Sequence, residues 1–349
     1  MHQTTSRAPF FAATDHPIVK VGLVVWDAVA AAKNYSQLFQ LGPWAFCEFA
    51  PTVSTLRDEA VDEDSFRVRV ATNTIGDKEI ELVQPLGQPN PYRAFLDERG
   101  EGIHHLGFAA TDDYDTLVAS AAAHGLTIEM EAIYPGPRRL VHFGPWQELG
   151  IFLEYSDIPA PELTPWGRHN QPGTGWISME EKRIAQIGIV TDDSERMARR
   201  YHELFGIGPW VLYDFKPPAG EARVLHDIPV EPGTDHLIKA AIADHTNLQF
   251  ELLQPVIGPS THLEYLLDKG PGAHHLSFDV VDDHDELVAT MQDRGIGIEM
   301  AGLGGDAFLY TYLATRDELA TFWEVVKFFP EEDVMAGAYG VYPPEGTEV

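Results

Sequence analysis

Two pairs of adjacent histidines are the residues of this sequence best placed to do chemistry. His104 and His105 lie in the apolar run Ile-His-His-Leu-Gly-Phe, and His274 and His275 lie in the matching run Ala-His-His-Leu-Ser-Phe. The second pair follows the first by 170 residues. Neutral imidazole is a common ligand of transition metals, so the repeated pairs are candidate metal-binding residues.

Two glutamates repeat with the same spacing. Glu81 in Ile-Glu-Leu-Val-Gln-Pro returns as Glu251 in Phe-Glu-Leu-Leu-Gln-Pro, and Glu154 in Phe-Leu-Glu-Tyr returns as Glu324 in Phe-Trp-Glu-Val. A carboxylate inside an apolar strand is costly to bury unless a cation or hydrogen-bond donors compensate it. Glutamate, histidine and glutamate at fixed spacing therefore indicate a divalent metal.

The composition excludes several classes of partner. A chain of 349 residues suits two domains of ordinary size, and 44% hydrophobic residues suffice for real cores. A net charge of −30 argues against binding nucleic acid and against docking on anionic membranes. Solubility is the simplest explanation of such a charge.

The single cysteine, Cys47, excludes an internal disulfide and fits a reducing compartment. The N-terminus carries no apolar stretch of signal-peptide length, and no run approaches 18 consecutive apolar residues. The sequence therefore predicts a soluble, cytoplasmic protein with no membrane partner.

The duplication extends well beyond the candidate ligands. The run Tyr-Ser-Gln-Leu-Phe-Gln-Leu-Gly-Pro-Trp at 35–44 matches Tyr-His-Glu-Leu-Phe-Gly-Ile-Gly-Pro-Trp at 201–210. A stretch between the halves is rich in proline and glycine, as linkers are. The expected division is an N-terminal extension (1–17), a first domain (18–157), a linker (158–183), a second domain (184–327) and a C-terminal tail (328–349).

Each half also repeats internally. Strands are predicted at 19–26, 105–110, 184–190 and 276–281, each followed by an amphipathic helix. The expected N-caps of these helices are Asp27, Asp112 or Asp113, Asp193 or Ser194, and Asp282 or Asp283. Runs typical of short antiparallel strands follow each helix, so the unit is β-α-β-β-β, present four times.

With these motifs the chain resembles the vicinal oxygen chelate superfamily, which includes glyoxalase I, methylmalonyl-CoA epimerase and the extradiol dioxygenases. The resemblance rests on the His-His-Leu strand, the Glu-Leu-x-Gln-Pro strand and the Leu-Phe-x-x-Gly-Pro-Trp segment. It implies an α+β fold in which four βαβββ modules pair into two cupped mixed β-sheet domains with flanking helices. Each cup of this family wraps one metal and its substrate.

The resemblance also assigns metal-facing positions. In the second half, which is preferred, they are Gln186, Glu251, His275 and Glu324. In the first half they are Lys20, Glu81, His105 and Glu154. These ligand types suit Zn, Ni, Mn, Fe or Co. Lysine cannot ligate as an ammonium, so Lys20 is either an ion-pair partner that replaces the metal or a catalytic electrophile beside a three-ligand metal.

Strand alternation fixes which histidine of each pair faces the metal. Side chains at i and i+2 share one face. Small residues follow the ligand positions by two, as at Gly22, Gly107, Gly188 and Ser277, and are expected to leave space for substrate. The same alternation sends His104 and His274 to the opposite face as packing residues.

The leading hypothesis is a divalent-metal-dependent enzyme like glyoxalase or the epimerases, an isomerase or lyase acting on a small-molecule carbonyl compound. The metal would stabilise an enolate, and Glu324 would move the proton, as the resemblance implies. One alternative is an extradiol-type dioxygenase, although two histidines and one carboxylate are not found at the expected positions. Another is a metal-free ligand-sequestering protein of the same fold. The chain could be a monomer or a homodimer.

Overall fold

A computed structural model gives the structure of this chain. It describes residue 10 and residues 16–57, 59–62, 64–109, 114–134, 138–157, 175–216, 223–278, 283–304, 307–329 and 337–344. Most of the predicted linker, and the predicted N-caps Asp112, Asp113 and Asp282, lie outside these residues.

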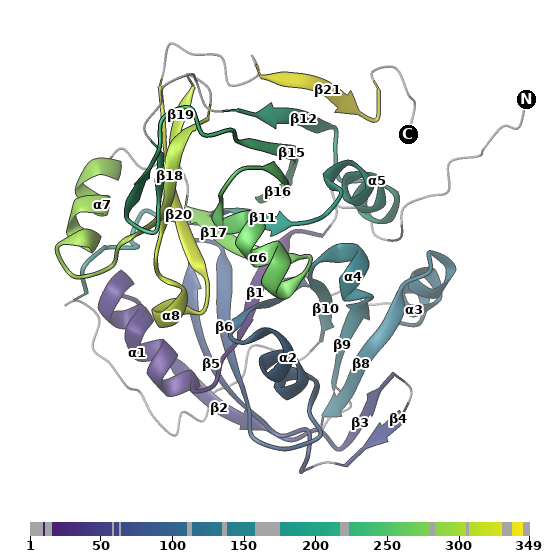
Figure 1. Ribbon diagram of the computed structural model, residues 1–349. Coiled ribbons are helices and arrows are strands. Elements are labelled where there is room, and N and C mark those ends of the chain that lie inside the picture. Colours follow the sequence, from purple (N-terminus) through teal and green to yellow (C-terminus); the bar gives the residue numbers. More distant parts are fainter. Residues whose placement is uncertain are drawn as a thin grey trace, which may run out of the picture.

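The first half forms one curled mixed sheet (Figure 1). Its strands are β1 (Ile18–Val24), β2 (Ala45–Phe49), β3 (Val53–Leu56), β4 (Glu59–Val61), β5 (Val68–Ile75), β6 (Lys78–Pro85), β7 (Gly102–Phe108), β8 (Thr127–Tyr134), β9 (Arg138–Gly144) and β10 (Phe152–Ser156). Its helices are α1 (Ala28–Phe39), α2 (Pro91–Arg99), α3 (Tyr114–Ala123) and α4 (Trp146–Leu149). The strand order is β2-β5-β6-β1-β7-β10-β9-β8-β3-β4, with β1 antiparallel to β7 where the two modules meet.

The second half repeats this plan. Its strands are β11 (Ile184–Val190), β12 (Trp210–Phe215), β13 (Arg223–Leu225), β14 (Ile228–Val230), β15 (Leu237–His245), β16 (Leu248–Ile257), β17 (Gly272–Phe278), β18 (Ile298–Gly304), β19 (Phe308–Leu313), β20 (Phe322–Phe328) and β21 (Ala338–Tyr342). Its helices are α5 (Ser194–Phe205), α6 (Thr261–Lys269), α7 (His284–Gln292) and α8 (Arg316–Leu319). The strand order is β14-β13-β18-β19-β20-β17-β11-β16-β15-β12-β21.

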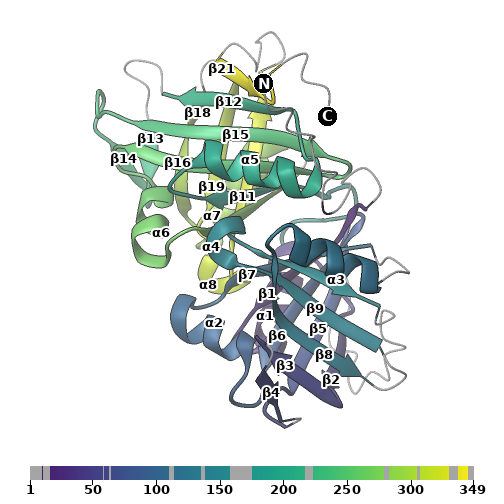
Figure 2. The same ribbon diagram turned by 90° about the vertical axis from the view of Figure 1, so that its right-hand side faces the viewer.

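The two halves pack against each other through equivalent elements. Helix α1 lies beside α8, and α5 lies beside α4 (Figures 1 and 2). The Tyr35 hydroxyl donates to the Leu319 carbonyl at 3.0 Å, and the Tyr201 hydroxyl donates to the Leu149 carbonyl at 2.7 Å. Because each contact repeats with the halves exchanged, the interface has approximate twofold symmetry. One hydrophobic core runs through both halves.

The predicted fold class is confirmed, and so is the β-α-β-β-β order of the modules. Asp27 caps α1 by accepting from the Val29 and Ala30 amides, and Asp193 caps α5 by accepting from the Arg196 amide. Trp44 and Trp210 are buried in the core. Each cap fixes where a helix leaves the rim of its sheet.

Helices α2 and α6 and the hairpins β3–β4 and β13–β14 are not among the elements expected from the sequence. The segment after residue 328, expected to be a tail, contains β21, which pairs with β12 at one edge of the second sheet. Among the described residues, no helix is long and apolar enough to cross a membrane.

Candidate metal centre

Four neighbouring strands carry the candidate residues into the hollow of the first sheet. The strands β6, β1, β7 and β10 are adjacent in that order and carry Glu81, Lys20, His105 and Glu154. Because these strands are neighbours and the sheet is curled, side chains on its concave face converge. The corresponding strands of the second sheet, β16, β11, β17 and β20, carry Glu251, Gln186, His275 and Glu324.

In the first half an ammonium group occupies the meeting point. The Lys20 Nζ donates to the Oε1 atom of Glu81 at 3.1 Å and of Glu154 at 3.0 Å. A third carboxylate oxygen, Glu79 Oε1, lies 3.7 Å from Nζ. The structure therefore shows Lys20 as an ion-pair partner of these carboxylates, which is one of the two arrangements that the sequence left open.

These charges stabilise one another. Burial alone would lower the pKa of Lys20, but the charges of Glu154, Glu81 and Glu79 outweigh it and raise the pKa above its usual range. Burial would raise the pKa of Glu81 and Glu154, yet the ammonium of Lys20 holds both below the ordinary value. The first cup is therefore compensated by a cation from its own chain.

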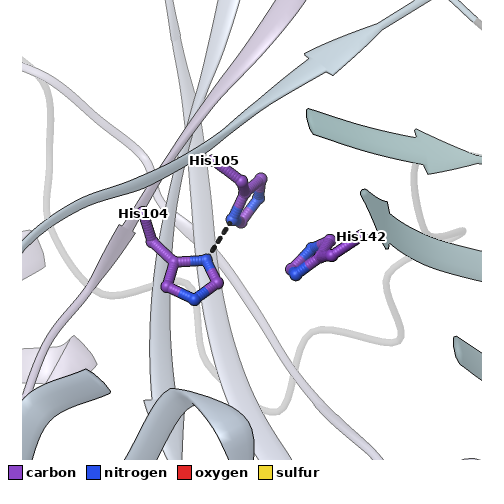
Figure 3. A group of neighbouring side chains, drawn as sticks. All are labelled: His104, His105 and His142. Carbon is purple, nitrogen blue, oxygen red and sulfur yellow. Dashed lines mark hydrogen bonds between the residues drawn. The ribbon is translucent and has the colours of Figure 1, made fainter. Parts of the chain in front are cut away.

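Histidines complete the first cup. The His105 Nε2 lies 3.2 Å from the Oε2 atoms of both Glu81 and Glu154. His142, on β9, places its Nε2 3.1 Å from Glu154 Oε2, and Figure 3 shows its ring next to His104 and His105. Sequence reasoning missed His142, although its place in an alternating strand and the tyrosine 170 residues later, Tyr312, could have drawn attention to it.

In the second half the same positions converge without such a cation. The His275 Nε2 lies 3.5 Å from Glu251 Oε2 and 3.6 Å from Glu324 Oε2. The counterpart of Lys20 is Gln186, a neutral residue. In the described part of the chain, none of these three converging atoms has a hydrogen-bond partner, and all three are fully buried.

The missing compensation changes the ionisation of the second cup. Burial raises the pKa of Glu251 to about 7. Burial also raises the pKa of Glu324 to about 7, although His275 and a hydrogen bond from Tyr312 act against it. Burial lowers the pKa of His275. The second cup thus holds two carboxyl groups, whose ionisation is disfavoured by burial, next to a neutral imidazole.

Gln186 does not join this group. Its side-chain amide donates to Gln249 Oε1 at 2.7 Å. It lines a separate hollow together with Gln249 and Ser277, whereas Glu251 and Glu324 line another one. The structure therefore brings together three of the four residues that the family resemblance assigns to the second site.

The glycines near the sites have a different role from the one predicted. A Cβ on Gly22 would lie 2.0 Å from Cε1 of His105, and one on Gly188 would lie 1.8 Å from Cε1 of His275. These two glycines therefore make room for the imidazole rings rather than for a substrate. The prediction that they leave space beside the metal is wrong for this reason.

The first histidine of each pair lies on the same face as the second, so the prediction from strand alternation is wrong. A β-bulge interrupts each strand at the pair, because Gly22 pairs with His105 while Leu23 pairs with Ile103, and the same shift recurs at His275 and Ala273. The His104 ring packs on Phe95 and Phe152, with ring centroids 4.9 Å away in each case. The His274 ring packs on Phe322 at 5.0 Å. Each first histidine also places its Nδ1 3.2 Å from the Nδ1 of the second histidine. The first histidine of each pair thus packs beside the second rather than behind it.

The cups differ in size. The cavity of the first cup has a volume of about 280 Å³ and combines Lys20 and its carboxylates with apolar and aromatic walls. The cavity of the second cup has a volume of about 40 Å³. It includes Glu251, Glu324, His262 and Tyr312.

The residues of the second cup fit a divalent transition metal. Two carboxylate oxygens and one imidazole nitrogen are ligands that Zn, Mn, Fe, Co and Ni accept. Glu251 Oε2 and Glu324 Oε2 each face His275 Nε2, and buried polar atoms without hydrogen-bond partners are costly unless something binds them. In the first cup the Lys20 ammonium already satisfies the equivalent carboxylates, so the fit is poor there.

Comparison with known families agrees with this architecture. The sequence matches the profile of the Glyoxalase/Bleomycin resistance protein/Dioxygenase superfamily over residues 20–143 and again over 185–308. The chain belongs to this superfamily. Among curated proteins, the uncharacterized protein YqjC of Bacillus subtilis is 31% identical to this chain over 114 residues. The match covers 32% of this chain and 78% of YqjC.

Solved structures show the same fold. A mutant of 4-hydroxymandelate synthase from Streptomyces coelicolor aligns with this chain with a TM-score of 0.58 at 15% identity. The alignment covers 90% of this chain and 93% of the synthase. A fusion protein of a xylose isomerase-like TIM barrel and 4-hydroxyphenylpyruvate dioxygenase aligns with a TM-score of 0.50 at 15% identity. That alignment covers 95% of the chain and 52% of the fusion protein. At such identities the likeness concerns the fold alone.

Proposed function

We propose that the second half binds one divalent transition-metal ion through Glu251, His275 and Glu324. We further propose that the protein is an enzyme that moves a proton at a carbon next to a carbonyl group, as an isomerase or lyase. The observation that carries the proposal is the convergence of three buried, unpartnered ligand atoms in the second cup. Zn, Ni, Mn, Fe and Co are all compatible with this donor set.

When bound, the ion supplies Lewis acidity that polarises a carbonyl oxygen and stabilises the negative charge that develops on it. The chain supplies the proton-transfer group and the exclusion of water. Glu324 is the proposed base, because its buried carboxylate lines the cavity of the second cup, where the carbonyl compound would bind. The hydrogen bond from Tyr312 orients its carboxyl group, and the small cavity leaves little room for solvent.

Lys20 has no part in this proton transfer. It lies in the other cup, and its raised pKa keeps it an ammonium. We propose that the first site, with Glu81, His105 and Glu154, works without metal and that Lys20 supplies its positive charge. A metal-free cavity of about 280 Å³ with apolar walls also suits ligand binding, so the first cup is the candidate for a sequestering role.

Metal content and isotope exchange test the proposal. Protein expressed without added metal should contain about one transition-metal ion per chain by elemental analysis, and Glu251→Gln should contain none. A panel of α-hydroxycarbonyl compounds and hemithioacetals serves as candidate substrates. In D2O the enzyme should exchange the hydrogen next to the carbonyl of some of them for deuterium, as measured by NMR. Oxygen uptake with catechols in place of deuterium exchange would favour a dioxygenase. Metal-free wild-type protein whose stability no divalent ion raises would refute the metal site.

A further inference from the structure

Two histidines that the sequence did not single out, His236 and His262, line the second cup, and only His262 of the two has both ring nitrogens buried without partners among the described residues. His262 is at the start of α6, where Ser260 Oγ accepts from the Leu263 amide and caps the helix. Its side chain is 2% exposed and lines the same cavity as Glu251 and Glu324. Within the described ranges, neither of its ring nitrogens has a hydrogen-bond partner.

Burying the imidazole of His262 without hydrogen-bond partners carries a cost in free energy. A buried polar group without a hydrogen-bond partner is costly, and both nitrogens of His262 are in this condition. An imidazole whose nitrogens make no hydrogen bond keeps one nitrogen lone pair free in its neutral form. A neutral imidazole with a free lone pair is the form that binds transition metals.

The ring is also close to one proposed ligand. One ring nitrogen each of His262, His274 and His275 lie within 4.8 Å of one another, and His262 shares its cavity with Glu251 and Glu324. Ligand atoms bound at about 2.1 Å from one ion lie about 3–4 Å apart, so the His262 ring would have to turn from His274 toward the two carboxylates to join them. Gln186, by contrast, is engaged by Gln249 and lines a different hollow.

We infer that His262, and not Gln186, is the fourth protein ligand of the metal in the second cup. The inference rests on the proposed metal site. It gives a donor set of two imidazoles and two carboxylates, with the second imidazole supplied by a helix rather than by a strand of the sheet.

The internal repeat supports this assignment. The counterpart of His262 in the first cup is Tyr92, and the counterpart of Tyr312 is His142. Each cup therefore has one histidine and one tyrosine at these two positions, but exchanged. In the first cup the histidine bonds Glu154 at 3.1 Å, and Lys20 supplies the positive charge. Only the second cup keeps a histidine without a partner, and that cup is the one without a lysine between its carboxylates.

Copper(II) is a suitable probe, because nitrogen ligands split its electron paramagnetic resonance signal. With one equivalent of Cu²⁺ the wild-type protein should show two coordinated nitrogens, from His262 and His275. The variant His262→Phe keeps an aromatic ring but no nitrogen and should show one. The variant Gln186→Leu should still show two. A wild-type spectrum with a single nitrogen, or two nitrogens retained in His262→Phe, would overturn the inference without any appeal to activity.

Affinity gives a second readout. Loss of a residue that only supports a ligand typically weakens metal binding about 10–100-fold. We expect His262→Phe to weaken Zn²⁺ or Mn²⁺ binding by more than that in competition with a chelator, and Gln186→Leu to leave it within about threefold. The reverse order of the two variants would return the fourth position to Gln186. Melting temperatures in EDTA show whether each variant is folded.

The variant Glu251→Gln separates the two hypotheses. If it binds metal as tightly as wild type, the proposed site itself is wrong. If it loses the metal while His262→Phe keeps full affinity and two nitrogens, the site stands and the role of His262 is refuted.

Discussion

Replacing Glu251 with glutamine should stabilise the metal-free protein at pH 8, although most substitutions of buried residues destabilise. Glu251 has a pKa of about 7 in the folded chain, against an ordinary value of 4.5. Because the folded state binds the proton more tightly, stability falls as pH rises through this window and stays low above it. The difference amounts to about 3 kcal/mol at pH 8 and less than about 1 kcal/mol at pH 5. Glutamine resembles the protonated carboxyl group and does not titrate, so it avoids this loss.

The assay is thermal unfolding in EDTA at both pH values. An unfolding entropy of about 2.1 cal/mol/K per residue gives about 0.7 kcal/mol/K for 349 residues. A gain of about 3 kcal/mol then corresponds to a rise of about 4 °C in melting temperature at pH 8. At pH 5 the two proteins should melt within about 1 °C of each other.

The internal repeat supplies the matched control. Glu81 occupies the same place in the first half but faces Lys20 at 3.1 Å. Removing one partner of a buried ion pair costs about 3–5 kcal/mol, so Glu81→Gln should lower the melting temperature at pH 8. If both variants destabilise the metal-free protein at pH 8, Glu251 is compensated after all, and the argument for a metal in the second cup loses its basis.

Two further substitutions test the contrast between the cups. Lys20→Gln should leave the carboxylates of Glu81 and Glu154 uncompensated, so it should lower the stability of the protein more at pH 8 than at pH 5. It should also raise the bound metal, measured by elemental analysis, from one to two ions per chain. An unchanged stoichiometry would show that the ammonium is not what excludes metal from the first cup. Gly188→Ala should displace the His275 ring, because its Cβ would lie 1.8 Å from Cε1, and should weaken Zn²⁺ binding at least about 10-fold by chelator competition; unchanged affinity would mean that the ring can shift without cost.

The sequence carried enough information for the modules and for the inner residues of each cup. Asp27 and Asp193 cap their helices by local hydrogen bonds, which depend on few neighbours. Strand alternation alone put His104 and His274 on the wrong face, because it takes no account of the bulge at each pair, whereas the spacing of 170 residues placed His105 and His275 in equivalent positions. These features are visible because they repeat or because they are local.

Other features depend on tertiary contacts and were not predictable in this way. Gln186 occupies the expected strand position, but Gln249 on the adjacent strand competes for its amide group. His262 belongs to a helix that sequence analysis did not find, so its proximity to Glu251 and Glu324 could not be foreseen. β21 pairs with a strand more than 100 residues earlier, and nothing local in its sequence indicates that partner.

The reciprocal contacts of Tyr35 and Tyr201 have an evolutionary consequence. An interface in which each half offers the other the same contact is what a pair of identical subunits makes. Covalent joining fixes the ratio of the two partners at one to one, so mutations can then accumulate in one copy without appearing in its companion. A substitution in one half, such as the lysine at position 20 where the other half has Gln186, then changes one cup and leaves its counterpart unaltered.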